Sequence, residues 1–274
     1  MSKLSDELEY DLTKMINMHS GEHLPNNLPY WMLQEGIVPG STILCAEGIG
    51  SKSKENKTDV IIYLHNSIPI KISAKLLNAD YFGNWYGHNR FLKEFGTAAF
   101  NRMTKASALW ANKWANTATN PFVGVSICFG KRTGNTAQRF TDIFTEDDIL
   151  TVAKGFGTGN HVANCMYISN TPALNIQGLI NSLEPITKVN VIRATSGFMI
   201  AHRPINPMTE GSNRGKNVYC RFAPYYRLPT KTTITNAKQL FSLGEFITVN
   251  SDCTNHNHIL NDLEHNFNIK IPRK

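Results

Sequence analysis

The chain has 274 residues, of which 41% are hydrophobic and 10% aromatic, so it can bury a sizeable core and is not a disordered chain. The net charge of +7 favours a polyanionic partner such as nucleic acid, although the charge can also serve solubility alone. Five scattered cysteines imply no disulfide framework, the charged amino-terminal segment is not a secretory signal, and no apolar run approaches the roughly 18 residues of a membrane span. We therefore expect a cytoplasmic protein that does not enter a membrane.

The amino-terminal third predicts a helix, a loop and a β-hairpin. Leu4, Leu8, Leu12 and Met15 recur at helical spacing, which predicts an amphipathic helix over 5–18. A loop-rich segment follows over 19–57. Two apolar, β-branched runs, 58–64 and 69–75, then flank a short polar turn at 65–68, which is typical of a hairpin.

Two opposite charges meet at the open end of this hairpin. If Leu64 pairs with Pro69 across the turn, Asp59 lies opposite Ala74 and next to Lys75. Antiparallel partners have Cβ atoms roughly 5 Å apart, so a carboxylate and an ammonium come together although they are far apart in the sequence. Such a pair could share a divalent cation and its bound water, or it could be a salt bridge of structural importance only.

The middle of the chain predicts a long helix, a buried strand and a second helix. A helix over about 88–116 has an apolar stripe that includes Trp110 and Trp114, which we interpret as core residues. The apolar run 122–129 predicts a buried strand with a basic turn after it, and 146–154 predicts a helix that ends at Gly155. The segment 155–160 resembles a phosphate-binding glycine loop, but it follows a helix rather than a strand, so we interpret it as a helix end and turn.

The second half returns to strand-like runs at 161–169, 188–194, 198–201, 218–222 and 246–249, and it closes with a helix over 259–267. Strands and helices that alternate in this way predict an α/β protein with a mixed central β-sheet flanked by helices. No linker is evident, so we expect one domain.

Asp59, the hairpin and the Ser73-x-Lys75 motif resemble the nuclease core of the PD-(D/E)xK superfamily, best known from type II restriction endonucleases. In that family an Asp opens one strand and a (D/E)-x-K sequence closes the next. The chain differs at two positions: Thr58 precedes Asp59 where the family has Pro, and Ser73 replaces the second acid. The resemblance implies a restriction-endonuclease-like fold with a single nuclease domain over 1–274, a catalytic core over about 40–170 and a DNA-recognition elaboration over about 171–274.

The resemblance also assigns roles to residues of the hairpin. Asp59 would be the main Mg²⁺ ligand, and the carbonyl of Ala74 or Ile72 a further ligand. Lys75 would orient or deprotonate the attacking water or stabilise the transition state, with Ser73 beside it in the motif. Some branches of the family supply the missing carboxylate from a following helix, for which Glu94 and then Asp80 are the candidates; a solvent-exposed helix acid is the alternative for Glu94.

Two polar segments are candidates for DNA contacts. The excursion 202–217 offers side chains that suit base edges in a groove, because Arg and Lys suit guanine and Asn suits adenine: Arg203, Asn206, Asn213, Arg214 and Lys216. Lys131 and Arg132 lie in the basic turn and suit phosphates. Either segment could instead be a surface loop with no DNA contact.

The carboxy-terminal residues Cys253, His256 and His258, with His265 further on, have the side chains that bind zinc. The His-x-His spacing would suit a strand, and no second pair matches it, so a structural zinc site stays open.

These observations together predict an endonuclease that cuts double-stranded DNA at a specific sequence through a Mg²⁺-activated water. A palindromic target would imply a homodimer. The alternatives are a non-catalytic nucleic-acid-binding protein and a small-molecule hydrolase with another site.

Overall fold

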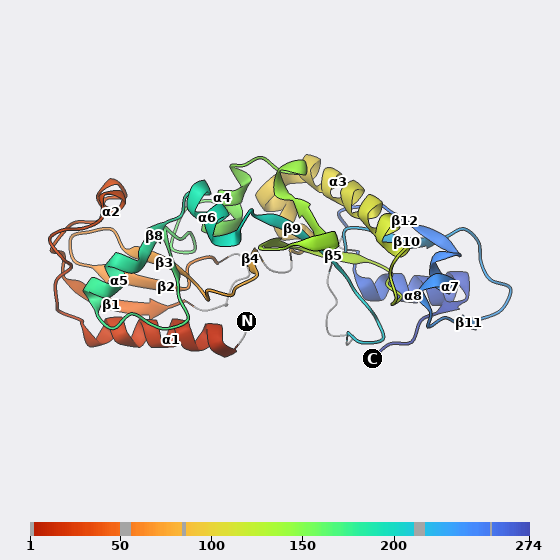
Figure 1. Ribbon diagram of the computed structural model, residues 1–274, viewed down its shortest axis with the longest axis horizontal. Helices are drawn as coiled ribbons and strands as arrows, with labels where there is room; N and C mark the ends of the chain where they lie inside the picture. Colours follow the sequence, from red (N-terminus) through yellow and green to blue (C-terminus); the bar gives the residue numbers. More distant parts are fainter. Residues whose placement is uncertain (1–2, 50–55, 84–85, 211–216, 253) are drawn as a thin grey trace. The chain divides into compact units, whose positions relative to one another are not determined.

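The computed structural model describes residues 3–49, 56–83, 86–210, 217–252 and 254–274, which form two compact units (Figure 1). The first unit comprises Met1–Phe82 and Glu146–Ser196, and the second comprises Gly83–Thr145 and Gly197–Lys274. The boundaries of these units do not coincide with the predicted division at about residue 170. The prediction of an α/β protein with mixed sheets flanked by helices is confirmed.

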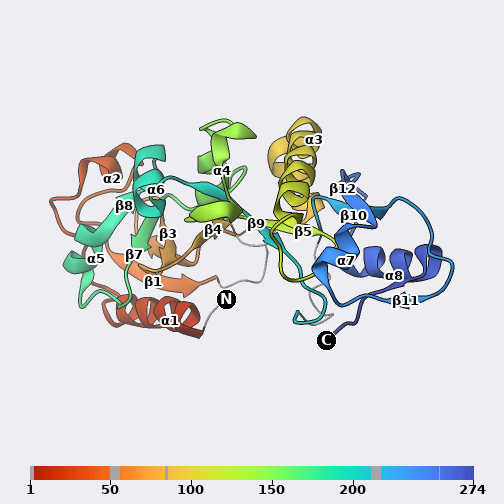
Figure 2. The same ribbon diagram turned by 45° about the vertical axis from the view of Figure 1, so that its right-hand side comes forward.

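The first unit begins with the predicted amphipathic helix, α1 (Lys3–Met18). Leu8, Leu12 and Ile16 recur every four residues, so they share one face, and each is at most 4% exposed. This face packs against β1 (Ile43–Gly48), β2 (Val60–Leu64) and β3 (Ile70–Lys75), and α1 lies along these strands in both Figure 1 and Figure 2. Burial of each such side chain contributes roughly 1.5–3 kcal/mol.

The predicted hairpin is formed by β2 and β3, but its register differs by one residue from our expectation. Val60 pairs with Ile72 and Ile62 with Ile70, so Asp59 lies opposite Ser73 rather than Ala74. Pro69 has no N–H to donate to the ladder, so the pairing begins at Ile70 and the connection is longer than predicted. Asn66 supplies the positive φ, 56°, that the turn requires.

The hairpin belongs to a mixed five-stranded sheet with the order β1-β2-β3-β7-β8. Its first three strands are antiparallel neighbours, whereas β7 (Cys165–Ile168) runs parallel to β3, with Ile72 beside Cys165. A parallel neighbour requires a crossover connection, and this one includes α4 (Asp148–Lys154). The antiparallel edge strand β8 (Leu183–Pro185) completes the sheet.

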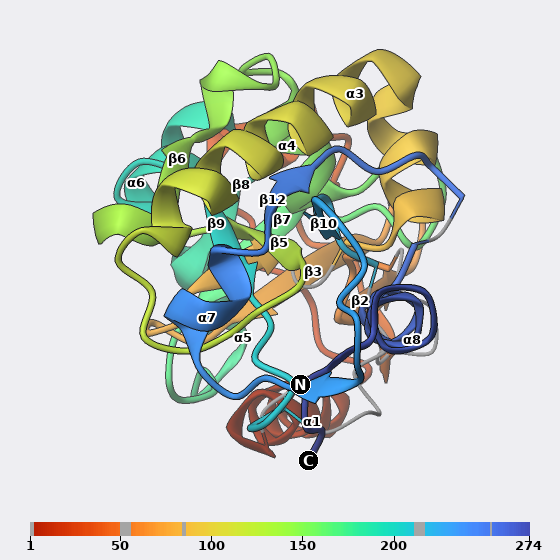
Figure 3. The same cartoon turned by 90° about the vertical axis from the view of Figure 1, so that its right-hand side faces the viewer.

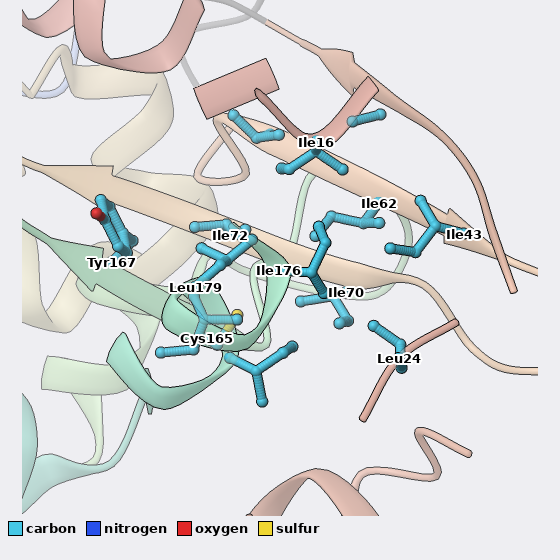
Figure 4. Close-up of a cluster of buried hydrophobic side chains, with 14 of the residues drawn as sticks. Ile16, Leu24, Ile43, Ile62, Ile70, Ile72, Cys165, Tyr167, Ile176 and Leu179 are labelled. Carbon is cyan, nitrogen blue, oxygen red and sulfur yellow. The ribbon is translucent and has the colours of Figure 1, made fainter. Parts of the chain in front are cut away.

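The core of the first unit lies between the sheet and its helices. Figure 4 shows Ile16 of α1 and Ile176 of α5 (Ile176–Ser182) directed toward Ile62, Ile70 and Ile72 of the hairpin. The apolar run that predicted the hairpin is therefore explained by burial, because β2 and β3 are interior strands. The short helix α2 (Tyr30–Gln34) adds the buried side chain of Met32.

The second unit is organised around the long helix α3 (His88–Ala115). The prediction of this helix is confirmed, but Gly96 interrupts it with φ 76° and ψ 173°, so the helix is kinked there. Glycine tolerates this conformation because it has no Cβ. Trp110 and Trp114 stack on each other and pack against the hydrophobic core, as predicted.

Short sheets and two further helices complete the second unit (Figure 3). In Figure 3, α3 lies across the view and α8 is seen end on, so these helices are not parallel. One sheet has four strands in the order β4-β5-β9-β6, of which β5, β9 and β6 are antiparallel neighbours. Two smaller pairs join β10 with β12 and β11 with β13. These elements are β5 (Val125–Gly130), β6 (Ala137–Arg139), β9 (Met199–Pro204), β10 (Arg221–Pro224), β11 (Thr232–Thr233), α7 (Ala237–Phe241), β12 (Gly244–Ile247), α8 (His256–Phe267) and β13 (Ile269–Lys270).

One predicted strand is wrong. The run 188–194 forms a helix, α6 (Lys188–Thr195), although valine and isoleucine favour strands. Thr187 caps this helix by accepting a hydrogen bond from the Asn190 N–H, and Val191 is buried. Capping and tertiary packing therefore outweigh the local β-propensity. The remaining elements are β4 (Tyr81–Gly83) and the 3₁₀ turns at Gly134–Thr136 and Phe140–Asp142.

Candidate active site

The carboxylate of Asp59 is fixed at the open end of the hairpin. Its backbone N–H donates to the Ile72 carbonyl at 2.8 Å, which extends the β2–β3 ladder by one residue. Its Oδ2 accepts hydrogen bonds from the Ala74 N–H at 2.8 Å and from Ser73 Oγ at 3.4 Å. The one-residue register shift therefore still leaves Asp59 in contact with Ser73 and Ala74.

Lys75 completes the contact that the sequence predicted. Its Nζ lies 2.9 Å from Asp59 Oδ2 and donates a second hydrogen bond to the Ala74 carbonyl at 2.8 Å. Only 14% of the Asp59 side chain and 19% of the Lys75 side chain are exposed. The Ala74 carbonyl, a predicted metal ligand, is thus occupied by the ammonium in this arrangement.

Glu9 of α1 is a site residue that our reading of the sequence missed. It is 8% exposed and its carboxylate has no hydrogen-bond or ion-pair partner among the described residues. Burial, and next the negative charge of Asp59, raise the pKa of Glu9 to about 7, while Lys75 acts in the opposite direction. Glu9 therefore shares the electrostatic environment of the hairpin pair. The sequence does contain a signal for Glu9, because its spacing from Leu12 and Ile16 places an acid on the apolar face of the helix.

The acids predicted to complete the site are placed differently. Glu94 belongs to the second unit, where its Oε1 accepts from Arg90 Nε at 2.7 Å and its Oε2 accepts from the Tyr86 hydroxyl at 2.7 Å. Its side chain is 3% exposed, so the alternative of a solvent-exposed helix acid is wrong. Asp80 is exposed and makes no hydrogen bond to Asp59 or Lys75.

The donor set of the first unit fits a hard divalent cation. Glu9 and Asp59 offer carboxylate oxygens, and Asp59 Oδ1 accepts no hydrogen bond from the described residues. Mg²⁺ is commonly held by one or two carboxylates and keeps several waters, so two acids are sufficient. Within the described ranges no group of three His, Cys, Asp or Glu residues converges on one point. The predicted Mg²⁺ site stays a prediction, with Glu9 in place of Glu94.

The residues predicted to contact DNA lie in the second unit where they are described. Arg203 is in β9 and its Nη1 lies 3.6 Å from Cys128 Sγ, whereas Asn206 forms a turn by accepting from the Met208 N–H. Lys131 is exposed, and Arg132 donates to Thr136 Oγ1. Asn213, Arg214 and Lys216 lie outside the described residues.

The carboxy-terminal histidines lie in a helix rather than in a strand, which the His-x-His spacing would suit. His256 and His258 lie in the first turn of α8, and Cys253 lies outside the described residues. Side chains two residues apart on a helix point in different directions. Burial lowers the pKa of His256 to about 4, as expected for a core histidine. His265, the fourth candidate, donates from its Nδ1 to the Asn261 carbonyl one turn earlier.

Comparisons of the chain with protein-family models, with curated proteins and with solved structures find no match. The functional argument therefore depends on the residues of the site. Among the described helices, none is long and apolar enough to cross a membrane.

Proposed function

We propose that the chain is a Mg²⁺-dependent endonuclease that resembles type II restriction enzymes and cuts double-stranded DNA at a specific sequence. The observation that carries this proposal is the short Asp59–Lys75 contact at the open end of an interior hairpin. The mixed sheet that contains the hairpin, with helices packed against it, supports a restriction-endonuclease-like fold.

The proposed roles follow from the chemistry of the three charged side chains. Asp59 and Glu9 would hold the cation through carboxylate oxygens, and Glu9 would supply the acid that is absent at Ser73. A divalent ion bound there lowers the pKa of a coordinated water and stabilises charge that develops on the phosphate. Lys75 donates to Asp59 in the free protein and can turn one of its three N–H donors toward the attacking water or a phosphate oxygen. Ser73 keeps the Asp59 carboxylate in place.

DNA recognition is proposed for the polar segments of the second unit. Arg203, Asn206 and the residues 213–216 would approach base edges, and Lys131 and Arg132 would contact phosphates. Cleavage of a palindromic target would be performed by a homodimer. The described cysteines Cys45, Cys128, Cys165 and Cys220 form no disulfide with one another, and the proposed location is the reducing cytoplasm.

The test is incubation of the purified protein with long duplex DNA of diverse sequence, in Mg²⁺ and in EDTA. Discrete fragments that require Mg²⁺ would support the proposal. Asp59→Asn and Glu9→Gln should prevent cutting, whereas the control Glu7→Gln, on the exposed side of the same helix, should cut normally. A continuous smear would retain the nuclease but remove sequence specificity.

The second candidate is a non-catalytic nucleic-acid-binding protein, which the net charge of +7 favours. In that case the Asp59–Lys75 contact is only structural. This candidate predicts DNA binding that weakens steeply with salt and no cleavage under any condition.

A further inference from the structure

The loop that follows α4 combines three glycines with nearby lysines in the first unit. Gly155, Gly157 and Gly159 have φ angles of 104°, 82° and 120°, values that side-chain-bearing residues rarely adopt. Gly155 ends α4, as predicted, and the chain then turns back to Ala163, whose N–H donates to the Lys154 carbonyl. The helix end alone does not require glycine at the two later positions.

The tip of this loop presents unpaired peptide groups to solvent. The N–H groups of Gly157, Thr158 and Gly159 donate no hydrogen bond within the part of the chain that the structure describes. A Cβ at Gly157 would meet nothing within 4 Å, so the tip is open. Successive unpaired N–H groups in turn conformations form concavities that bind anions.

Two lysines add positive charge to the loop. Lys71 Nζ donates to the Gly159 carbonyl at 3.0 Å, and Lys154 is the last residue of α4. Both are half-buried, and neither has an ion-pair partner among the described residues. Burial, and next the charge of Lys154, lower the pKa of Lys71, while Glu35 acts in the opposite direction. Two like charges kept close together are stabilised by an anion.

The loop is tied to the hairpin that carries the candidate active site. The Lys57 N–H, two residues before Asp59, donates to the His161 carbonyl at 3.0 Å. Lys71 and Lys75 are four residues apart on β3 and therefore project from the same face, with Cα atoms roughly 13 Å apart. A DNA strand rises about 3.4 Å per nucleotide, so this distance corresponds to about four nucleotides.

We propose that Lys71, Lys154 and the amides of 157–159 bind a backbone phosphate of nucleic acid, a few nucleotides from the phosphate that meets Asp59. This inference deepens the proposed function and depends on it for the position of the reacting phosphate. The site would hold the strand in register without reading its sequence.

The first test measures DNA binding of the double variant Lys71→Met, Lys154→Met, which keeps both aliphatic stems. Fluorescence anisotropy with a labelled duplex in EDTA, over a range of salt concentrations, gives the dependence of affinity on salt. Loss of one phosphate contact should reduce the slope of log K against log salt by about 1 and weaken binding to all sequences alike. Circular dichroism checks that the variant folds.

The matched control removes two lysines that already have carboxylate partners. Lys188 contacts Asp147, and Lys231 contacts Glu264, so Lys188→Met with Lys231→Met removes the same charge without removing a free cation. The control should keep the wild-type slope. An unchanged slope in the Lys71→Met, Lys154→Met variant, or an equal change in the control, overturns the proposal.

A second test does not require DNA. In a titration with inorganic phosphate at constant ionic strength, the NMR signals of Gly157 and Gly159 should shift in the wild type and stay unchanged in the Lys71→Met, Lys154→Met variant. If these signals shift but the DNA slope is unchanged, the site takes free phosphate and the backbone assignment is wrong. If neither responds, no anion site exists.

The two proposals can fail separately. A slope that changes in a protein that never cuts DNA supports the phosphate site and removes the nuclease. Mg²⁺-dependent cutting with an unchanged slope keeps the nuclease and removes the phosphate site.

Discussion

The Asp59–Lys75 pair of the first unit and the Arg90–Glu94 pair of the second are similar in length, at 2.9 and 2.7 Å, and both are shielded from solvent. They differ in what surrounds the carboxylate. Both oxygens of Glu94 accept a hydrogen bond, and the Arg90 guanidinium also lies 4.0 Å from the centre of the Tyr86 ring. Within the described part of the chain, every donor to Asp59 contacts Oδ2 and none contacts Oδ1.

A second difference is that another acid, Glu9, acts electrostatically on the Asp59–Lys75 pair. Glu9 lies in the field of Asp59 and Lys75, and burial, followed by the negative charge of Asp59, raises its pKa to about 7. A satisfied buried pair is typical of structure, whereas an unsatisfied pair with a perturbed neighbour is typical of a functional site. The surroundings of the carboxylates therefore distinguish the Asp59–Lys75 pair from the Arg90–Glu94 pair, which the two distances alone do not.

The largest expected effect is on catalysis. Lys75→Ala should reduce the rate of DNA cleavage by about 10²–10³-fold, because it removes one donor that stabilises transition-state charge. DNA binding measured in EDTA should stay within a factor of about two of the wild type, since one ammonium among many contributes little to binding. Cleavage kinetics with a saturating duplex provide the measurement.

The matched variant for this prediction is Lys188→Ala, which removes a surface lysine from a contact with Asp147. It should cut at the wild-type rate. Normal cleavage by Lys75→Ala would make the hairpin pair structural and remove the main difference between the two pairs.

The second effect is on stability. Glu94→Ala should reduce the free energy of unfolding by about 3–5 kcal/mol, because it removes the carboxylate that neutralises the buried Arg90 charge. Urea denaturation measures this change. The control is Asp142→Ala, which breaks the exposed Arg139–Asp142 pair and should cost about 0–1 kcal/mol. A loss below 1 kcal/mol for Glu94→Ala would contradict the structural role.

A smaller effect tests the hydrogen bond from Tyr86 to Glu94. Tyr86→Phe removes the hydroxyl and keeps the ring under Arg90, so it should destabilise the protein by about 1.5–3 kcal/mol, the usual contribution of a hydrogen bond to a charged group. Burial raises the pKa of Tyr86 well above its ordinary value, so the hydroxyl stays protonated and the effect should not vary between pH 6 and 9. Urea denaturation across this range is the measurement, and a loss confined to low pH would contradict the assignment.

The sequence predicted the elements whose pattern comes from burial. The helix α1, the hairpin and α3 can all be predicted from the sequence, since each has an apolar face or an apolar run. The apolar pattern predicts a hairpin register that is wrong by one residue, because Pro69 cannot pair. It also predicts a strand where α6 lies, because β-branched residues favour strands even in a segment that is capped as a helix. The assembly of each unit from separate stretches of chain could not be predicted, because it depends on contacts between residues far apart in sequence.

Only part of the candidate site could be predicted from the sequence, for the same reason. Asp59 and Lys75 could be paired because a hairpin joins neighbours in sequence. Glu9 lies on a helix that is 50 residues earlier, and only tertiary packing brings it into the electrostatic field of that pair. Glu94 is a candidate because it lies on a following helix, but Arg90, four residues before it, forms an ion pair with it, which accounts for an acid at this position.

The last prediction concerns Glu9 and has the smallest effect. The folded pKa of about 7 is above the unfolded value of 4.5, so the stability associated with Glu9 is fully present below pH 4.5 and is lost as the pH rises through 7. Without metal at pH 8, Glu9→Gln should therefore be more stable than the wild type, by about 1–2 kcal/mol. Thermal unfolding at pH 5 and pH 8 measures this difference, and Glu7→Gln on the exposed face of α1 is the control.

Mg²⁺ should reverse that order, because the ion must displace the proton from Glu9. Its affinity for the wild type should rise up to about tenfold per pH unit below pH 7 and level off above it, whereas Glu9→Gln should bind weakly at every pH. Calorimetric titration at pH 6, 7 and 8 gives the comparison. If Glu9→Gln is less stable than the wild type at pH 8, Glu9 is a structural acid like Glu94. Asp59 would then have to bind the ion without it.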